Sequence, residues 1–145
     1  MNTIAIGNDH AGTHYKFQIV KLLEKQGYTV LNFGTDTSDS MDYPDAIHPV
    51  ANAVESGEAT FGIILCGSGN GAQMTANKYP NIRAGLCWNE EQAMLTRLHN
   101  NANILSLPGR FVPFDMGWKI TRTFLTTDFE GGRHTNRVEK ISELL

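Results

Sequence analysis

A cysteine opens a segment with three glycines in six residues, which reads Cys66-Gly67-Ser68-Gly69-Asn70-Gly71. Glycine lets a backbone approach a ligand closely and adopt positive φ angles. A helix that begins after this segment would offer free N–H groups to a phosphate or a developing oxyanion. The same donors would favour the thiolate form of Cys66. The segment therefore predicts either a reactive thiolate beside an anion site or a tight turn around a buried, inert cysteine.

The residues after this segment exclude two familiar phosphate-binding loops. A Walker loop places Lys and then Ser or Thr after its second glycine, and a cysteine-phosphatase loop ends on an Arg that clamps phosphate. This chain has Ala72 and Gln73 there. The segment also resembles the dinucleotide-binding glycine pattern only loosely, and it follows the third predicted strand rather than the first.

Titratable side chains follow other predicted elements. Asp9 and His10 come directly after the first strand, where they could bind sugar hydroxyls or phosphate and move protons; alternatively, Asp9 caps a helix. His99 and Asn100 end a predicted helix, where a histidine either acts in catalysis or complements the helix dipole. Tyr43 follows a polar loop and could cover a ligand.

Arg133 and Arg137 are four residues apart and therefore share one face of a helix. Two guanidinium groups on one face repel each other unless an anion lies between them, and a phosphate fits their planar geometry. The alternative is surface pairing with Glu130 and Glu139. Arg110, which follows a glycine, is a third candidate for phosphate binding.

We expect neither a metal nor a redox cofactor. His10 and His14 are four residues apart, but no third ligand accompanies them. Two cysteines are too few for a disulfide framework. Cys66 and Cys87 follow predicted strands that should be neighbours, so oxidation could link the two thiols.

Short apolar runs alternate with longer amphipathic ones, which predicts strands alternating with helices. The strands are expected at 3–7, 28–33, 61–65, 82–87 and 103–107, and the helices at 12–26, 43–55, 72–78, 90–98, 114–125 and 135–145. This pattern predicts a single doubly wound (Rossmann-like) α/β domain over residues 1–145, with a five-stranded parallel sheet of order 2-1-3-4-5 and helices on both faces. Ligands bind such folds where the strand order reverses, between the first and third strands. Asp9, His10 and Cys66 should therefore converge there.

Composition restricts the function class. The 145 residues carry a net charge of −3 and are 41% hydrophobic. A basic nucleic-acid-binding surface and a disordered chain are therefore not expected. No apolar run reaches the roughly 18 residues of a membrane span. The first residues lack the basic and apolar regions of a signal peptide, so we expect a reducing, cytoplasmic setting with free thiols.

Several ordered motifs together resemble the type B ribose-5-phosphate isomerases and the related galactose-6-phosphate isomerase subunits, along essentially the whole chain. They are Gly7-Asn8-Asp9-His10-Ala11-Gly12, Asp42-Tyr43-Pro44, Cys66-Gly67-Ser68-Gly69-Asn70-Gly71, Ala76-Asn77-Lys78, Ile82-Arg83-Ala84, His99-Asn100-Asn101-Ala102-Asn103 and Glu130-Gly131-Gly132-Arg133-His134.

The resemblance implies a role for each candidate. Cys66 looks like the base that moves a proton between C2 and C1 of the open-chain sugar phosphate; some relatives use a Glu six residues later, where this chain has Ala72. Asp9 and His99 look like the groups that open the furanose ring. Ser68 and the backbone amides of Gly67, Gly69, Asn70 and Gly71 resemble the site that stabilises the enediolate. The residues that resemble the phosphate site are His10, Arg110, Arg133 and Arg137. Tyr43 and Asn100 resemble residues of the sugar pocket.

The expected activity is interconversion of ribose 5-phosphate and ribulose 5-phosphate, without a cofactor. The resemblance also implies a homodimer or tetramer whose pockets are built from two chains. Ser68 stands where many relatives have Thr, and Asn70 could reshape the pocket floor. Two alternatives stay open: an isomerase for a hexose 6-phosphate such as allose or galactose 6-phosphate, and a phosphosugar-binding module without catalysis.

Overall fold

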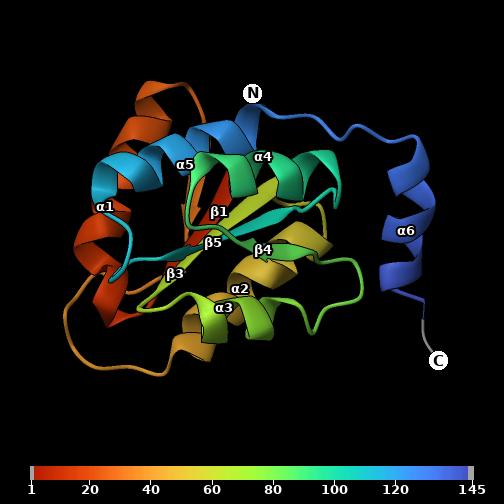
Figure 1. The fold of residues 1–145 in the computed structure, drawn as a ribbon. Coiled ribbons are helices and arrows are strands. Elements are labelled where there is room, and N and C mark those ends of the chain that lie inside the picture. Colours follow the sequence, from red (N-terminus) through yellow and green to blue (C-terminus); the bar gives the residue numbers. More distant parts are fainter. Residues whose placement is uncertain (1, 144–145) are drawn as a thin grey trace.

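Five parallel strands form the centre of the protein (Figure 1). A computed structural model describes residues 2–143. The strands are β1 (Thr3–Asn8), β2 (Thr29–Asn32), β3 (Phe61–Cys66), β4 (Ala84–Leu86) and β5 (Ile104–Pro108), and they lie in the order β2-β1-β3-β5-β4. In β1, β3 and β5 nearly every residue is buried, as expected for strands covered on both faces.

Helices cover both faces of the sheet. They are α1 (Thr13–Lys25), α2 (Tyr43–Glu55), α3 (Asn70–Ala76), α4 (Glu90–Leu98), α5 (Phe114–Thr126) and α6 (Arg133–Ile141), with a 3₁₀ turn at His10–Gly12. Helices α1, α4 and α5 bury Ile19, Ala93 and Phe124 in one core, whereas α2 and α3 bury Val50 and Ala72 in the other. Helix α6 belongs to neither layer (Figure 1). Within residues 2–143, no helix combines the length and apolarity that a membrane crossing requires.

The predicted fold class and the five parallel strands are confirmed, but the predicted order of the last two strands is wrong. Strand β5 has five mostly apolar residues, which suits it to a place inside the sheet, and all five of them are buried there. Strand β4 has three residues, of which two are only half-buried, and it forms the edge. Gln73 of α3 and Asn77, the residue after this helix, hydrogen-bond the backbone groups of β4 that face away from β5: the Ala84 N–H donates to Asn77, while Asn77 and Gln73 donate to the Ala84 carbonyl. An edge paired in this way offers little to a further strand.

The corrected order also separates the two cysteines. Cys66 ends β3 and Cys87 follows β4, and β5 lies between these strands, so the expectation that they follow neighbouring strands is wrong. Both cysteines are free. Burial raises the pKa of Cys87 to about 12, which makes it an unreactive thiol at neutral pH.

Two helices begin earlier than predicted. Helix α3 starts at Asn70, inside the glycine-rich segment, and α6 starts at Arg133 and ends at Ile141. The last two residues of the predicted 135–145 helix lie outside the described residues. The early start places Arg133 in the first turn of α6, one turn before Arg137.

Candidate active site

The carboxyl ends of β1 and β3 lie side by side. Asn8 is in register with Leu65, and the Asp9 N–H donates to the Leu65 carbonyl at 3.3 Å. Asp9 therefore lies beside Cys66, at the predicted reversal of strand order. The Asp9 carboxylate also accepts the Ala11 N–H at 3.0 Å, so the predicted helix-capping contact is present as well.

Cys66 is buried under the turn that joins β3 to α3. The Gly69 N–H donates to its Sγ at 3.2 Å, and the Asn70 N–H donates to the Ser68 hydroxyl at 3.3 Å. Gly69 has a φ of +78°, a conformation that a side chain would strain. A backbone donor aimed at sulfur stabilises a thiolate more than a thiol. The turn therefore suits a cysteine that acts as a base.

Three other candidates surround this turn. A methyl group at Gly71 would lie 2.3 Å from the Tyr43 ring, and one at Gly67 would lie 3.2 Å from Arg110 Cδ, so both glycines make room for these side chains. His10 accepts the Met41 N–H at 3.2 Å. We call this set the carboxyl-edge cluster; it comprises Asp9, His10, Tyr43, Arg110 and the segment from Cys66 to Gly71.

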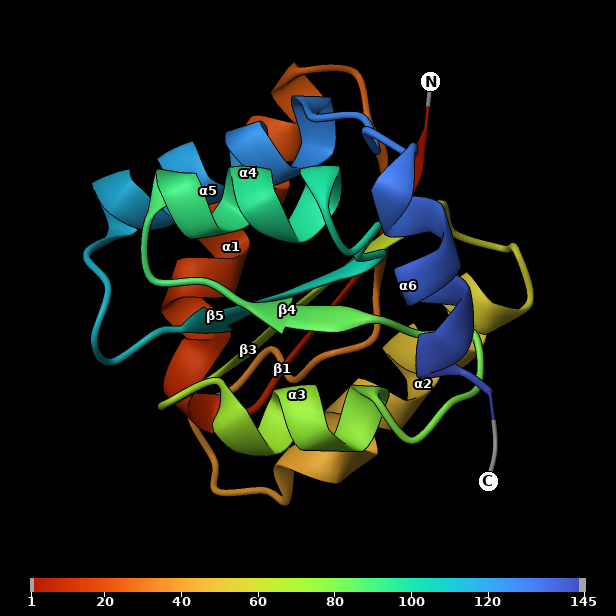
Figure 2. The same cartoon turned by 45° about the vertical axis from the view of Figure 1, so that its right-hand side comes forward.

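The other four candidates lie at the opposite edge of the sheet. Helix α4 returns the chain from the end of β4 to the start of β5, so His99 and Asn100 follow it at the amino edge. Helix α6 is joined to this edge by hydrogen bonds from the Glu130 N–H to the Leu98 carbonyl and from the Ser142 hydroxyl to the Pro80 carbonyl. Figure 2 shows α6 on the side of the molecule away from the start of α3.

This second set, which we call the amino-edge cluster, comprises His99, Asn100, Arg133 and Arg137. A hollow of about 380 Å³ is lined by members of the cluster and their neighbours, namely His99, Asn100, His134, Arg137, Val138 and Ile141. A strand of five or six residues separates the two edges by roughly 15–20 Å. One copy of the chain therefore does not bring all the predicted site residues together.

Two residues next to His99 were not predicted as site residues from the sequence. The His99 and His134 rings stack with centroids 4.2 Å apart, and Glu130 Oε2 lies 3.8 Å from His99 Nε2 and 3.7 Å from His134 Nε2. Burial and the neighbouring His99 lower the pKa of His134. The i, i+4 spacing of Glu130 and His134 was the available signal, but their contact with His99 is tertiary. Among residues 2–143, neither Arg133 nor Arg137 pairs with Glu130 or Glu139.

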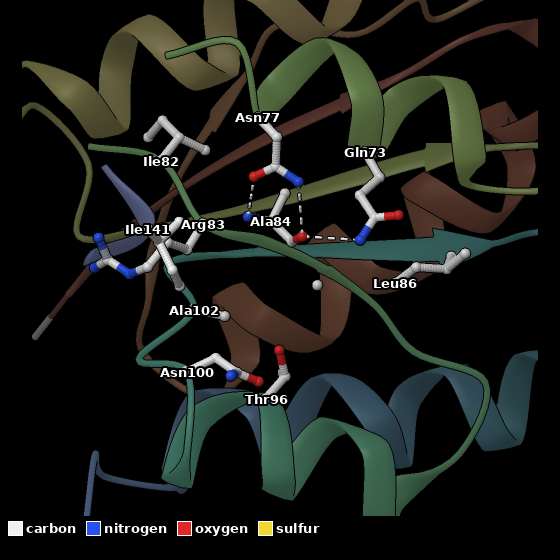
Figure 3. Close-up of a pocket in the computed structure, with 11 residues that line it drawn as sticks. Gln73, Asn77, Ile82, Arg83, Ala84, Leu86, Thr96, Asn100, Ala102 and Ile141 are labelled. Carbon is white, nitrogen blue, oxygen red and sulfur yellow. Dashed lines mark hydrogen bonds between the residues drawn. The ribbon is translucent and has the colours of Figure 1, made fainter. Parts of the chain in front are cut away.

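A second hollow lies beside the edge strand β4, between the two clusters (Figure 3). It measures about 400 Å³, and its walls come from α3, β4, α4 and α6. Gln73, near the carboxyl-edge turn, lines one wall, and Asn100 and Ile141 line the other. In Figure 3, Gln73 and Asn77 turn back onto Ala84, while Thr96 and Asn100 face them across the hollow.

Comparison with known proteins identifies the chain's relatives. The family model for Ribose/Galactose Isomerase matches residues 4–141. The chain belongs to this family. It is 40% identical over 144 residues to Ribose-5-phosphate isomerase B of Escherichia coli, covering 99% of this chain and 97% of that protein.

Solved structures of the family have the same fold. The Ribose-5-Phosphate Isomerase B of Clostridium thermocellum is 48% identical with a TM-score of 0.95, and the match covers 97% of this chain and 95% of that one. The enzyme of Mycoplasma genitalium, solved with bound ribulose-5-phosphate, is 39% identical with a TM-score of 0.94 over 97% and 93% of the two chains. The resemblance drawn from the motifs is therefore confirmed at the level of the family.

Proposed function

We propose that this protein interconverts ribose 5-phosphate and ribulose 5-phosphate through an enediolate. The observation that carries the proposal is the position of Cys66, whose sulfur accepts the Gly69 N–H at 3.2 Å beside Asp9, in a chain of the isomerase family. Isomerisation next to a carbonyl needs one base and a donor for the developing oxyanion. The Cys66 turn offers both, and a base of this kind requires a reduced thiol.

The proposed reaction moves two sets of protons. Asp9 and His99 open the furanose: one of them takes the proton of the C1 hydroxyl, and the other protonates the ring oxygen, O4, as the C1–O4 bond breaks. The Cys66 thiolate then removes the C2 proton of the aldehyde and returns it to C1, while Ser68 and the N–H groups of the turn stabilise the enediolate oxygen. Phosphate binding away from the reacting carbons orients the substrate.

The phosphate-binding and sugar-binding assignments complete the proposed site. His10 and Arg110 of the carboxyl-edge cluster and Arg133 and Arg137 of the amino-edge cluster bind the phosphate. Tyr43 and Asn100 contact the sugar, and the backbone amides of Gly67, Gly69, Asn70 and Gly71 line the turn.

We propose further that each pocket is completed by a second copy of the chain. The roles above need both clusters, and these lie at opposite edges of one sheet. If the carboxyl-edge cluster of one copy meets the amino-edge cluster of another, two-fold symmetry requires the reciprocal contact too. The axis must then pass between the clusters, where the hollow beside β4 lies. Met74 of α3, next in the chain to Gln73 of this hollow, is 67% exposed and suits an interface.

A substrate panel tests the activity. We expect the purified protein to convert ribose 5-phosphate with a higher kcat/KM than allose 6-phosphate or galactose 6-phosphate. Turnover in deuterated water should also place deuterium at C1 or C2, because the proton that the Cys66 thiol holds after taking it from the substrate exchanges with solvent. A preference for a hexose phosphate would reassign the substrate. Binding of ribose 5-phosphate without deuterium incorporation would indicate a non-catalytic module.

Mixing two impaired variants tests the shared pocket. Cys66→Ala and Arg137→Met alter different clusters, so a hybrid dimer of the two keeps one intact pocket. After random exchange, half of the dimers are hybrids with one intact pocket of two, so kcat/KM should recover to about a quarter of the unmutated value. Cys66→Ala with Arg110→Met is the matched control, because both changes fall in the carboxyl-edge cluster and every pocket stays defective. Equal recovery in the two mixtures would refute the two-chain pocket.

A further inference from the structure

Three metal-ligating side chains meet at the amino edge. They are His99 at the end of α4, Glu130 in the segment before α6, and His134 in the first turn of α6. Their ligand atoms all lie within 4.8 Å of one another. Both Nε2 atoms face the same carboxylate oxygen, at 3.7 and 3.8 Å. Ligands about 2.0–2.2 Å from a tetrahedral Zn²⁺ are about 3.4 Å apart, so the two distances to Glu130 need only a small contraction. The His99 and His134 rings are stacked at an interplanar angle of 17°, so the His99 ring, whose side chain is 37% exposed, must turn out of the stack for both nitrogens to point at one ion.

A second observation points independently to a ligand. His134 is 5% exposed, and within the described residues its Nε2 has no hydrogen-bond partner. A buried imidazole nitrogen without a partner is costly, and such an atom calls for an explanation. Glu130 Oε2, at 3.7 Å, is too far away for a hydrogen bond to this nitrogen, and the Glu130 carboxylate is half-exposed. A bound cation would pair both groups at once.

We propose that His99, Glu130 and His134 form a binding site for a divalent transition-metal ion of the zinc class, and that this ion inhibits the enzyme. Two imidazoles and a carboxylate leave a fourth position open, as in other three-ligand zinc sites. The inhibition rests on the proposed function, because the metal would occupy the His99 nitrogen that ring opening needs. The binding itself does not rest on that function.

The positive charges around this site favour a metal ion that binds reversibly and inhibits over one that stays permanently bound. Arg133 and Arg137 lie on α6 with His134, and Arg137 lines the same hollow. Their positive charge weakens the binding of any cation, and an ion that competes with a sugar phosphate must be displaceable. Imidazole with one carboxylate suits Zn²⁺, Ni²⁺ or Co²⁺ rather than Mg²⁺ or Ca²⁺, which prefer oxygen ligands.

Metal binding to the intact protein provides a readout that is independent of turnover. Co²⁺ alone should give the intense visible absorption of a tetrahedral site, with one ion bound per chain, and Zn²⁺ should displace it. Mg²⁺ should do neither. We expect His134→Gln and Glu130→Gln each to weaken Zn²⁺ binding at least about tenfold. Glu130→Gln guards against misfolding, because this side chain is half-exposed and the change keeps its shape.

Two controls separate this site from other ligands of the chain. His48→Gln removes an exposed histidine far along the chain, and Cys66→Ser removes the thiol that would itself bind zinc; both variants should keep the Co²⁺ spectrum. Loss of the spectrum in Cys66→Ser, or its retention in Glu130→Gln and His134→Gln together, would overturn the proposed site.

The failure of this proposal differs from the failure of the proposed function. A protein that isomerises ribose 5-phosphate but binds no Co²⁺ refutes the metal site alone. A protein that binds Co²⁺ through Glu130 and His134 but turns over no sugar phosphate refutes the proposed function alone. When both hold, Zn²⁺ should inhibit turnover, and Glu130→Gln should need at least about tenfold more Zn²⁺ for the same fractional inhibition.

Discussion

The carboxyl-edge and amino-edge clusters are positioned in different ways. In the first, Asp9 and Cys66 follow directly from paired strands of the sheet, and the Arg110 N–H donates to the Gly67 carbonyl at 3.0 Å. In the second, the two arginines stand on α6, whose one buried residue is His134. The sheet fixes the first cluster before any partner is present, whereas the second depends on a docked helix. The difference suggests that the proposed base and enediolate site are built into the sheet, whereas the part of the proposed phosphate site formed by Arg133 and Arg137 depends on how α6 docks.

The substitution expected to lower turnover most is in the carboxyl-edge cluster. Cys66→Ala should lower kcat by about 10²–10⁴-fold, because it removes the proposed base and no carboxylate stands at position 72 to replace it. The measurement is turnover of ribose 5-phosphate by an enzyme shown to be folded.

Cys87→Ala is the matched control for this change. Its thiol is buried, with a pKa raised to about 12, so its removal should alter stability more than kcat. Comparable kcat values for the two alanine variants would contradict the assignment of Cys66 as the base.

The sequence predicted the first cluster better than the second for a physical reason. Residues after parallel strands must gather at one edge of the sheet, so Asp9 and Cys66 could be placed together from strand positions alone. No such rule brings His99 to His134, because that contact depends on how α6 docks. The wrong predicted order of β4 and β5 has a related cause. Local sequence patterns identify a strand, but its place in the sheet depends on which strand is long and apolar enough to be buried on both sides.

The next largest effect on the reaction is expected from a substitution in the amino-edge cluster. Arg137→Met should lower kcat/KM for ribose 5-phosphate by roughly 10–100-fold, the value of one charge-assisted hydrogen bond to phosphate. The loss should be smaller for a neutral sugar, which carries no phosphate to bind. Lys140→Met, a charge removed from the same helix one turn beyond, is the control. If both variants behaved alike, α6 would contribute only general positive charge.

Substituting one glycine in each region compares how strongly the two clusters are constrained, as measured by the free energy of unfolding. Gly69 opens α3 with a φ of +78°, and a methyl group there would lie 2.5 Å from Leu86 Cδ1; Gly132 opens α6 with a φ of +56° and has no atom within 4 Å of that position. Gly69→Ala therefore adds overlap to backbone strain, whereas Gly132→Ala adds strain alone. We expect losses of about 2–5 kcal/mol and about 1–3 kcal/mol in the free energy of unfolding. Urea denaturation measures both, and the reverse ranking would show that α6 is the more tightly constrained region.

The smallest expected effect concerns the segment that covers the carboxyl-edge cluster. Lys16 is fully buried, and its Nζ donates to Asn32, to the Thr35 carbonyl at 2.8 Å and to the exposed Asp36. These bonds fix the start of the segment that ends in Met41, whose N–H donates to His10. The hydrogen bond from Lys16, followed by that from Asn32, lowers the pKa of Asp36.

This lowered pKa predicts how the stability of the segment depends on pH. A carboxyl whose pKa is lower in the folded state stabilises the fold above its unfolded pKa, about 3.9, and loses that contribution as the pH falls through the folded value. Asp36→Asn should therefore lower the urea midpoint slightly at pH 7, and the difference from the unmutated protein should shrink below about pH 4. Asp39→Asn, which removes a charge from the same segment without altering the Lys16 bonds, should leave the midpoint nearly unchanged at pH 7. A difference for Asp36→Asn that persists at low pH would show that the side chain acts through packing rather than through its charge.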